Sequence, residues 1–135
     1  MSLVKWDPSF SVKVAVCDEH HKKLFQLVNE LHDAMGSGKG TEIIERVVKE
    51  LANYTKFHFS AEEALMEKSK YPELSSHRLQ HQAFIKKVEV VQHDISSGKG
   101  GQSAVVLAFL KEWLTKHIKE SDQRYSSHLN ANGVS

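Results

Sequence analysis

Residues 58–81 read HFSAEEALMEKSKYPELSSHRLQH, and this stretch decides the fold. Pro72 disfavours helical backbone in the residue before it, so one helix is expected to end near Lys70 and the next to begin at about Leu74. Each of these helices carries two possible metal ligands, spaced four residues apart as on one helix face: His58 with Glu62, and His77 with His81. The stretch therefore predicts a helical hairpin with both pairs near its turn.

Apolar residues recur at three- and four-residue intervals on both sides of this hairpin, and no alternating strand pattern competes with them. Four amphipathic helices are expected, beginning near Cys17, Thr41, Leu74 and Ser103, with Asp18 as the N-cap of the first. Glycine-rich stretches at 36–40 and 97–101 are expected to end the first and third helices. Short connections between amphipathic helices predict an all-α fold, an up-down-up-down antiparallel four-helix bundle.

The length of 135 residues fits one domain, residues 1–135. Within it we expect an N-terminal arm at 1–16, the bundle at 17–129 and a flexible tail at 130–135. Trp6 and Phe10 are expected to pack the arm against the bundle.

Two further groups of possible ligands lie on the first and fourth helices: His21, and the pair His117 and Asp122. In an up-down bundle the starts of helices one and three share an end with the finishes of helices two and four. With a rise of ~1.5 Å per residue, all seven side chains are then predicted within roughly 5–17 Å of one bundle end. His117 and Asp122 are ~140° apart on an ideal α-helix, so a shared site requires a local π-type turn between them.

A single histidine on an apolar helix face is usually a hydrogen-bonded core residue, but the two carboxylates call for another explanation. A buried carboxylate must be paired, protonated or metal-bound, and no Lys or Arg occupies the predicted inward positions. Five imidazoles and two carboxylates exceed one tetrahedral site and suit two adjacent ions. The ligand types alone leave zinc and manganese open beside iron. The predicted ligands are His21, His58, Glu62, His77, His81, His117 and Asp122.

Composition excludes several other classes of function. The formal net charge is +1 and the charges are interspersed, which argues against a nucleic-acid-binding surface. The single cysteine, Cys17, excludes an intrachain disulfide framework and fits a reducing compartment. The N-terminus lacks the features of a signal peptide, and no segment is apolar enough to span a membrane. We therefore expect a cytoplasmic protein without nucleic-acid or membrane partners, its protein partner unknown.

These residues resemble the hemerythrin family, particularly its single-domain bacterial members. The resemblance extends from Trp6 to Tyr125, and the five-residue step before Asp122 matches the family. The matching segments are DEHHKKLF with His21, HFSAEE with His58 and Glu62, HRLQH with His77 and His81, and WLTKHIKESD with His117 and Asp122.

The resemblance implies a non-heme centre of two iron ions, Fe2+ or Fe3+, with an oxo or hydroxo bridge. It implies that His77, His81 and His117 hold one iron, that His21 and His58 hold the other, and that Glu62 and Asp122 bridge them. The two-histidine iron would keep an open position for dioxygen. Family counterparts of the residues that line the dioxygen pocket are Leu24, Phe59, Met66, Trp113 and Leu114.

One position departs from the family, which commonly has glutamine where His20 stands. Either of the two adjacent histidines could then be the ligand. We assign His21 because it shares a helix face with Leu24 and Phe25, whereas His20 turns ~100° away.

The function that the resemblance implies is reversible dioxygen binding for storage, delivery or scavenging, and not catalysis. A histidine-rich site stabilises high-valent iron less well than a carboxylate-rich one, which disfavours cleavage of the O–O bond. The alternatives are a di-iron enzyme that handles nitric oxide, peroxide or iron oxidation, and an oxygen or redox sensor or iron buffer, a sensor requiring a separate partner.

Overall fold

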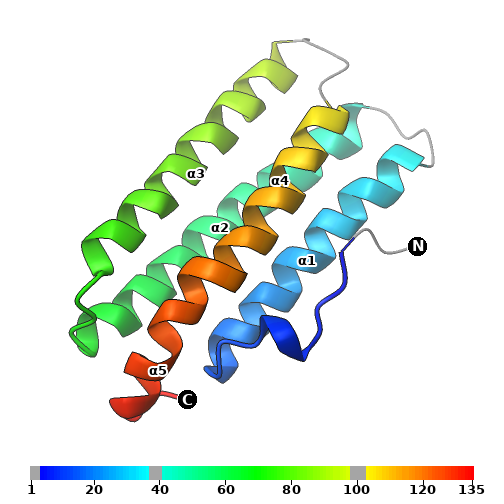
Figure 1. Ribbon diagram of the computed structural model, residues 1–135. Helices are drawn as coiled ribbons and strands as arrows, with labels where there is room; N and C mark the ends of the chain where they lie inside the picture. Colours follow the sequence, from blue (N-terminus) through cyan, green and yellow to red (C-terminus); the bar gives the residue numbers. More distant parts are fainter. Residues whose placement is uncertain (1–3, 37–40, 98–102) are drawn as a thin grey trace.

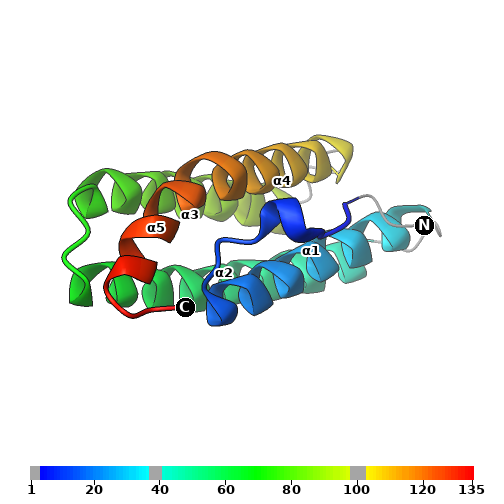
Figure 2. The same ribbon diagram turned by 60° about the horizontal axis from the view of Figure 1, so that its bottom comes forward.

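The computed structural model describes residues 4–36, 41–97 and 103–135, and these residues contain helices and no strand. Four long helices run side by side in alternating directions (Figure 1), and this confirms the predicted four-helix bundle. Viewed along another direction, α1 and α2 form one layer and α3 and α4 the other (Figure 2). The elements are a 3-10 turn at Pro8–Phe10, α1 at Ala15–Gly36, α2 at Thr41–Lys68, α3 at Leu74–Ser96, α4 at Ser103–His117, a π turn at Ile118–Asp122 and α5 at Gln123–Ala131.

The turn between α2 and α3 forms where Pro72 predicted it. Lys70 adopts a left-handed backbone with φ of 58°. The N–H of Lys70 donates to the carbonyl of Glu67, and the N–H of Tyr71 donates to that of Met66. This pair of hydrogen bonds is a Schellman motif, which satisfies the last carbonyls of α2 and ends the helix.

The start of α1 differs from the prediction, because the helix begins at Ala15 and Asp18 lies inside its first turn. Asp18 is therefore not the N-cap. Its carboxylate accepts hydrogen bonds from the backbone N–H of Val12 at 2.9 Å and from the hydroxyl of Ser11 at 2.6 Å. Asp18 thus ties the arm to the helix. An aspartate near the start of a helix is a common N-cap, so the sequence pattern alone did not separate these two roles.

The arm packs against the bundle through the two aromatic residues that were predicted to hold it. Phe10 is buried and meets the ring of Phe25 edge-on, with centroids 5.0 Å apart. Trp6 is half-buried beneath the ammonium group of Lys22, 4.6 Å from the ring centroid.

The C-terminal segment, where a flexible tail was predicted from residue 130 onward, makes contacts with the rest of the chain. The side-chain amide of Asn130 donates to the carbonyls of Lys13 and Val134, at 2.9 and 2.7 Å. Val134 packs against the core.

Of the two glycine-rich stretches, residues 37–40 and 98–101 lie outside the described residues. Within the described part of the chain, no helix has both the length and the apolar character needed to cross a membrane.

Candidate metal centre

The seven predicted ligands meet at one end of the bundle. They come from the start of α1, the finish of α2, the start of α3, and the junction of α4 with the π turn. None is more than 6% exposed, and their exposed fractions are 0% for His21, 1% for His58, 1% for Glu62, 3% for His77, 1% for His81, 6% for His117 and 1% for Asp122. The structure therefore brings all seven into one buried cluster.

The donor atoms of this cluster form two groups, in each of which the atoms lie within 4.8 Å of one another. Glu62 and Asp122 belong to both groups. The remaining members are His77, His81 and His117 in the first group, called the three-histidine set below, and His21 and His58 in the second, the two-histidine set. Two neighbouring groups that share two carboxylates suit a pair of cations bridged by those carboxylates.

The imidazole rings turn their Nε2 atoms toward one another, so their lone pairs converge. Nε2 of His21 lies 3.1 Å from Nε2 of His58, and Nε2 of His81 lies 3.2 Å from Nε2 of His117. One N–H can join each facing pair, with one nitrogen donating and the other accepting. Cations placed between such nitrogens would engage both lone pairs.

The carboxylate of Asp122 gives a second indication that the cluster suits a cation. Both of its oxygens are buried and neither accepts a well-aligned hydrogen bond, although Nε2 of His77 and Nε2 of His117 each lie 3.0 Å from Oδ1. A buried carboxylate without hydrogen bonds is costly, and coordination to a metal ion removes that cost. The donor set and these orphaned oxygens fit a metal centre.

Electrostatics within the cluster couple the imidazoles to the carboxylates. Burial alone would lower the pKa of His21, but the close contacts of its imidazole with the carboxylates of Asp122 and Glu62 outweigh burial and raise that pKa to about 9. The same balance raises the pKa of His77 to about 9. Burial would raise the pKa of Asp122 and Glu62, yet the surrounding imidazoles hold both below their ordinary values. Metal binding here must therefore displace protons from the histidines.

A phenol holds the shared carboxylate of Glu62 from outside the cluster. The hydroxyl of Tyr125 donates to Oε2 of Glu62 at 2.8 Å, and the residue is fully buried. Burial, together with the charges of Glu62 and Asp122, raises the pKa of Tyr125 well above its ordinary value. Tyr125 therefore stays a hydrogen-bond donor.

The π turn at Ile118–Asp122 explains how two residues five apart reach one site. It begins directly after His117 and ends at Asp122, and regular α-helix continues on both sides. The wider turn brings residues with i,i+5 spacing onto one face. This confirms the local widening that the spacing of His117 and Asp122 predicted.

Of the two adjacent histidines, His21 enters the cluster and His20 does not. Nε2 of His21 lies 3.1 Å from Oδ2 of Asp122 and 3.4 Å from Oε2 of Glu62. His20 is half-buried between α1 and α2, with its Nδ1 2.9 Å from Nδ1 of His58.

Two residues behind the predicted ligand His81, Glu63 and Arg78, were not identified from the sequence. Nδ1 of His81 lies 2.8 Å from Oε2 of Glu63, and since a carboxylate can only accept, the imidazole donates. Nε of Arg78 donates to the other oxygen of Glu63 at 2.9 Å. Glu63 directly follows Glu62, and this acidic neighbour was the available signal, but the direction of its side chain depends on a conformation that the sequence does not give. His20 was noticed only as a competing ligand.

A narrow apolar cavity lies one helical turn from the cluster. Its walls include four of the five residues expected to line a dioxygen pocket: Leu24, Phe59, Trp113 and Leu114. The fifth, Met66, is not one of them, because it follows Glu62 by a turn whereas the residues of α2 in the cavity wall are Leu51, Thr55 and Phe59. The cavity volume is about 10 Å³, at the lower limit for one water molecule, and its apolar lining offers few hydrogen bonds to hold one.

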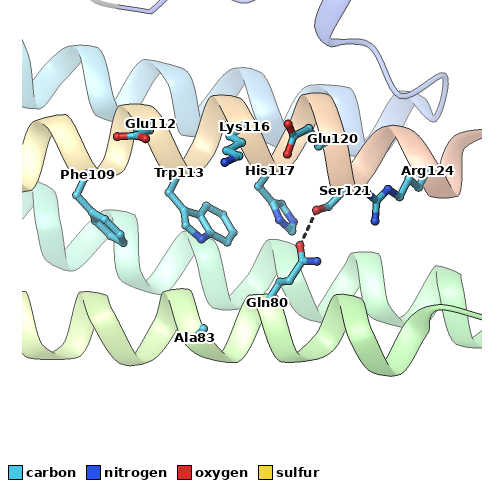
Figure 3. A pocket seen from close by; sticks show the side chains of 10 residues that line it. All are labelled: Gln80, Ala83, Phe109, Glu112, Trp113, Lys116, His117, Glu120, Ser121 and Arg124. Atoms are coloured by element: carbon cyan, nitrogen blue, oxygen red, sulfur yellow. Dashed lines mark hydrogen bonds between the residues drawn. The ribbon is translucent and has the colours of Figure 1, made fainter.

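A larger groove of about 560 Å³ reaches the cluster from solvent between α3 and α4 (Figure 3). His117 and Trp113 lie side by side in it, with ring centroids 4.3 Å apart and an interplanar angle of 14°. Ser121 donates to Gln80 across the groove at 2.5 Å. Charged residues of both signs line the remainder.

Comparison with known proteins agrees with this geometry. The family model described as "Hemerythrin HHE cation binding domain" matches residues 12–129. A bacteriohemerythrin from Stenotrophomonas maltophilia is 32% identical over 97% of this chain and 84% of its own length. One from Methylococcus capsulatus is 30% identical over 97% of this chain and 100% of its own. A crystal structure of wild-type hemerythrin superposes with a TM-score of 0.89 at 28% identity, covering 95% of this chain and 98% of that one.

Proposed function

The chain belongs to the hemerythrin family, and on that premise we propose that it binds dioxygen reversibly at a di-iron centre. The observation that carries the proposal is the pair of buried donor groups that share Glu62 and Asp122. One shared carboxylate would suit many metal sites, whereas two shared carboxylates beside five imidazoles suit two adjacent ions. Members of this family bind oxygen at such a centre, which favours iron over other divalent metals.

We assign the three-histidine set to one iron and the two-histidine set to the other, with Glu62 and Asp122 bridging. Two ferrous ions would supply the two electrons that dioxygen takes up on binding. The ion with two histidines has one protein ligand fewer, so the small molecule is expected there. Tyr125 would hold the bridging carboxylate of Glu62 in place through its hydrogen bond.

The chain's own residues favour reversible binding over catalysis in two ways. Imidazole is neutral, so a set of five histidines and two carboxylates stabilises high-valent iron less than a carboxylate-rich set. The apolar cavity beside the cluster keeps water away, and its lining residues Leu24 and Leu114 lie one turn from the ligands His21 and His117. Both features oppose cleavage of the O–O bond and loss of the oxygen.

The test is anaerobic loading of metal-free protein with Fe2+, followed by metal analysis and absorption spectra in oxygen and then under argon. We expect two irons per chain and a spectrum that appears in oxygen and reverts when oxygen is removed. A His32→Ala variant is the control, because His32 lies outside both donor groups. Loading with fewer than two irons would refute the metal assignment. Sustained consumption of dioxygen, peroxide or nitric oxide would identify an enzyme instead.

A further inference from the structure

His20 is the residue of the HH pair that the metal centre does not use, yet it touches the centre. Its Nδ1 lies 2.9 Å from Nδ1 of His58, and the two rings meet edge-on with centroids 5.0 Å apart and an interplanar angle of 89°. The rings of Tyr54 and Phe57 lie beside it, at centroid distances of 5.9 and 5.2 Å. The His20 side chain is thus held against the outer edge of a proposed ligand.

The direction of this hydrogen bond follows from the chemistry of His58. Nε2 of His58 faces the cluster, 3.1 Å from Nε2 of His21 and 3.1 Å from Oε2 of Glu62. When a metal ion takes the lone pair of Nε2, a neutral imidazole carries its proton on Nδ1. That N–H points at Nδ1 of His20, which must then be an acceptor, with its own proton on Nε2.

We propose that His20 is a positioning residue for the two-histidine iron: it accepts the Nδ1–H of His58 and so fixes the tautomer and the ring orientation that present Nε2 to the metal. This inference rests on the proposed function, because it requires a metal ion at Nε2. Partners of this kind behind metal-bound histidines typically change metal affinity by about 10–100-fold when removed.

Two variants separate hydrogen bonding from packing. His20→Phe keeps a planar ring between Tyr54 and Phe57 but removes the acceptor. His20→Gln changes the shape but returns an acceptor in its side-chain oxygen. A purely structural role for His20 would favour the phenylalanine, and a positioning role would favour the glutamine.

The experiment is an anaerobic Fe2+ titration of each protein against a competing chelator, with thermal unfolding of the metal-free forms as a check on the fold. For His20→Phe we expect about tenfold or greater weakening of one of the two irons and little change in the other. His20→Gln should recover most of that loss, and His32→Phe, the matched control on the same helix, should match the unsubstituted protein. Two irons of unchanged affinity in His20→Phe would overturn the proposal.

A direct measurement does not depend on any variant. In unsubstituted protein labelled with 15N-histidine and loaded with diamagnetic Zn2+, a scalar coupling across the N–H···N bond should link Nδ1 of His58 to Nδ1 of His20. Absence of that coupling in protein that holds two zinc ions would overturn the positioning role and leave the metal centre standing. Failure of the unsubstituted protein to take up two metal ions would instead refute the proposed function itself.

Discussion

In the half of the centre built by α3 and α4, the ligand His81 is backed by the carboxylate of Glu63, which Arg78 holds in turn. In the half built by α1 and α2, the ligand His58 is backed by the half-buried imidazole of His20. A carboxylate that accepts the outer N–H makes an imidazole a more basic ligand than a neutral acceptor does. The three-histidine iron is therefore expected to bind more tightly for two reasons, its additional ligand and its charged support.

Two hollows of different character lie near the centre. A groove open to solvent reaches His117 of the three-histidine set, whereas the apolar cavity of about 10 Å³ lies a turn from the centre among core residues. On the proposed assignment the two ions divide their tasks: the ion with three histidines is retained more firmly, and the ion with two histidines exchanges a small molecule. The predictions below test this division at increasing distance from the metal.

Removal of a ligand should have the largest effect. We expect His117→Ala to lower iron content below two per chain and to reduce the stabilisation gained on metal loading, because metal binding is linked to folding. Iron analysis and thermal unfolding with and without Fe2+ measure both quantities. Lys116→Ala, at the neighbouring exposed position, is the control. Two irons per chain in His117→Ala would contradict the ligand assignment.

Enlarging the apolar cavity should have the second-largest effect. Leu114 is 6% exposed, lines the cavity and precedes His117 by three residues on the same face. Leu114→Ala is expected to cost roughly 2–5 kcal/mol of unfolding free energy and to admit water, so that the oxygen-dependent spectrum decays faster in air.

Leu110→Ala is the matched control, because Leu110 lines the same cavity one turn further from His117. The Leu110 variant should lose comparable stability and retain a longer-lived spectrum. Equal lifetimes in the Leu114 variant and the unsubstituted protein would show that Leu114 serves only as core.

These two tests rest on features that the sequence already predicted. Helical periodicity and Pro72 fixed the order of the helices, and the up-down topology placed all seven side chains at one end of the bundle. The five-residue step from His117 to Asp122 predicted the π turn, because no ideal α-helix brings that pair to one site.

The sequence did not predict the supports behind the ligands, since these depend on side-chain conformations and on the rotation of each helix about its axis. Glu63 and His20 are both adjacent to a ligand in the sequence, and adjacency alone does not show which neighbour reaches back toward it. Met66 lies a turn beyond Glu62 and does not line the apolar cavity, so its place in a dioxygen pocket stays a prediction from the family resemblance.

Neutralising the carboxylate behind His81 should have a smaller effect than removing a ligand. Glu63→Gln retains an oxygen that can accept from His81 but removes the charge, so we expect about tenfold weaker binding of the tighter iron. The measurement is the Fe2+ competition titration. Glu67→Gln is the control, because Glu67 is 74% exposed at its side chain and lies 3.9 Å from the same arginine. If Glu63→Gln weakened the looser iron instead, the assignment of charged support to the three-histidine set would be wrong.

The smallest effect is expected one step further out, at the arginine that holds Glu63. The Arg78 side chain is 41% exposed, against 20% for Glu63, so solvent screens their ion pair. Exposed ion pairs contribute about 0–1 kcal/mol, so Arg78→Gln should change iron affinity by at most about fivefold. The same titration measures it, and higher salt should reduce the difference further, because exposed charges are screened. A loss in Arg78→Gln as large as that in Glu63→Gln would mean that the arginine, through the position it imposes on the carboxylate, controls the support of His81.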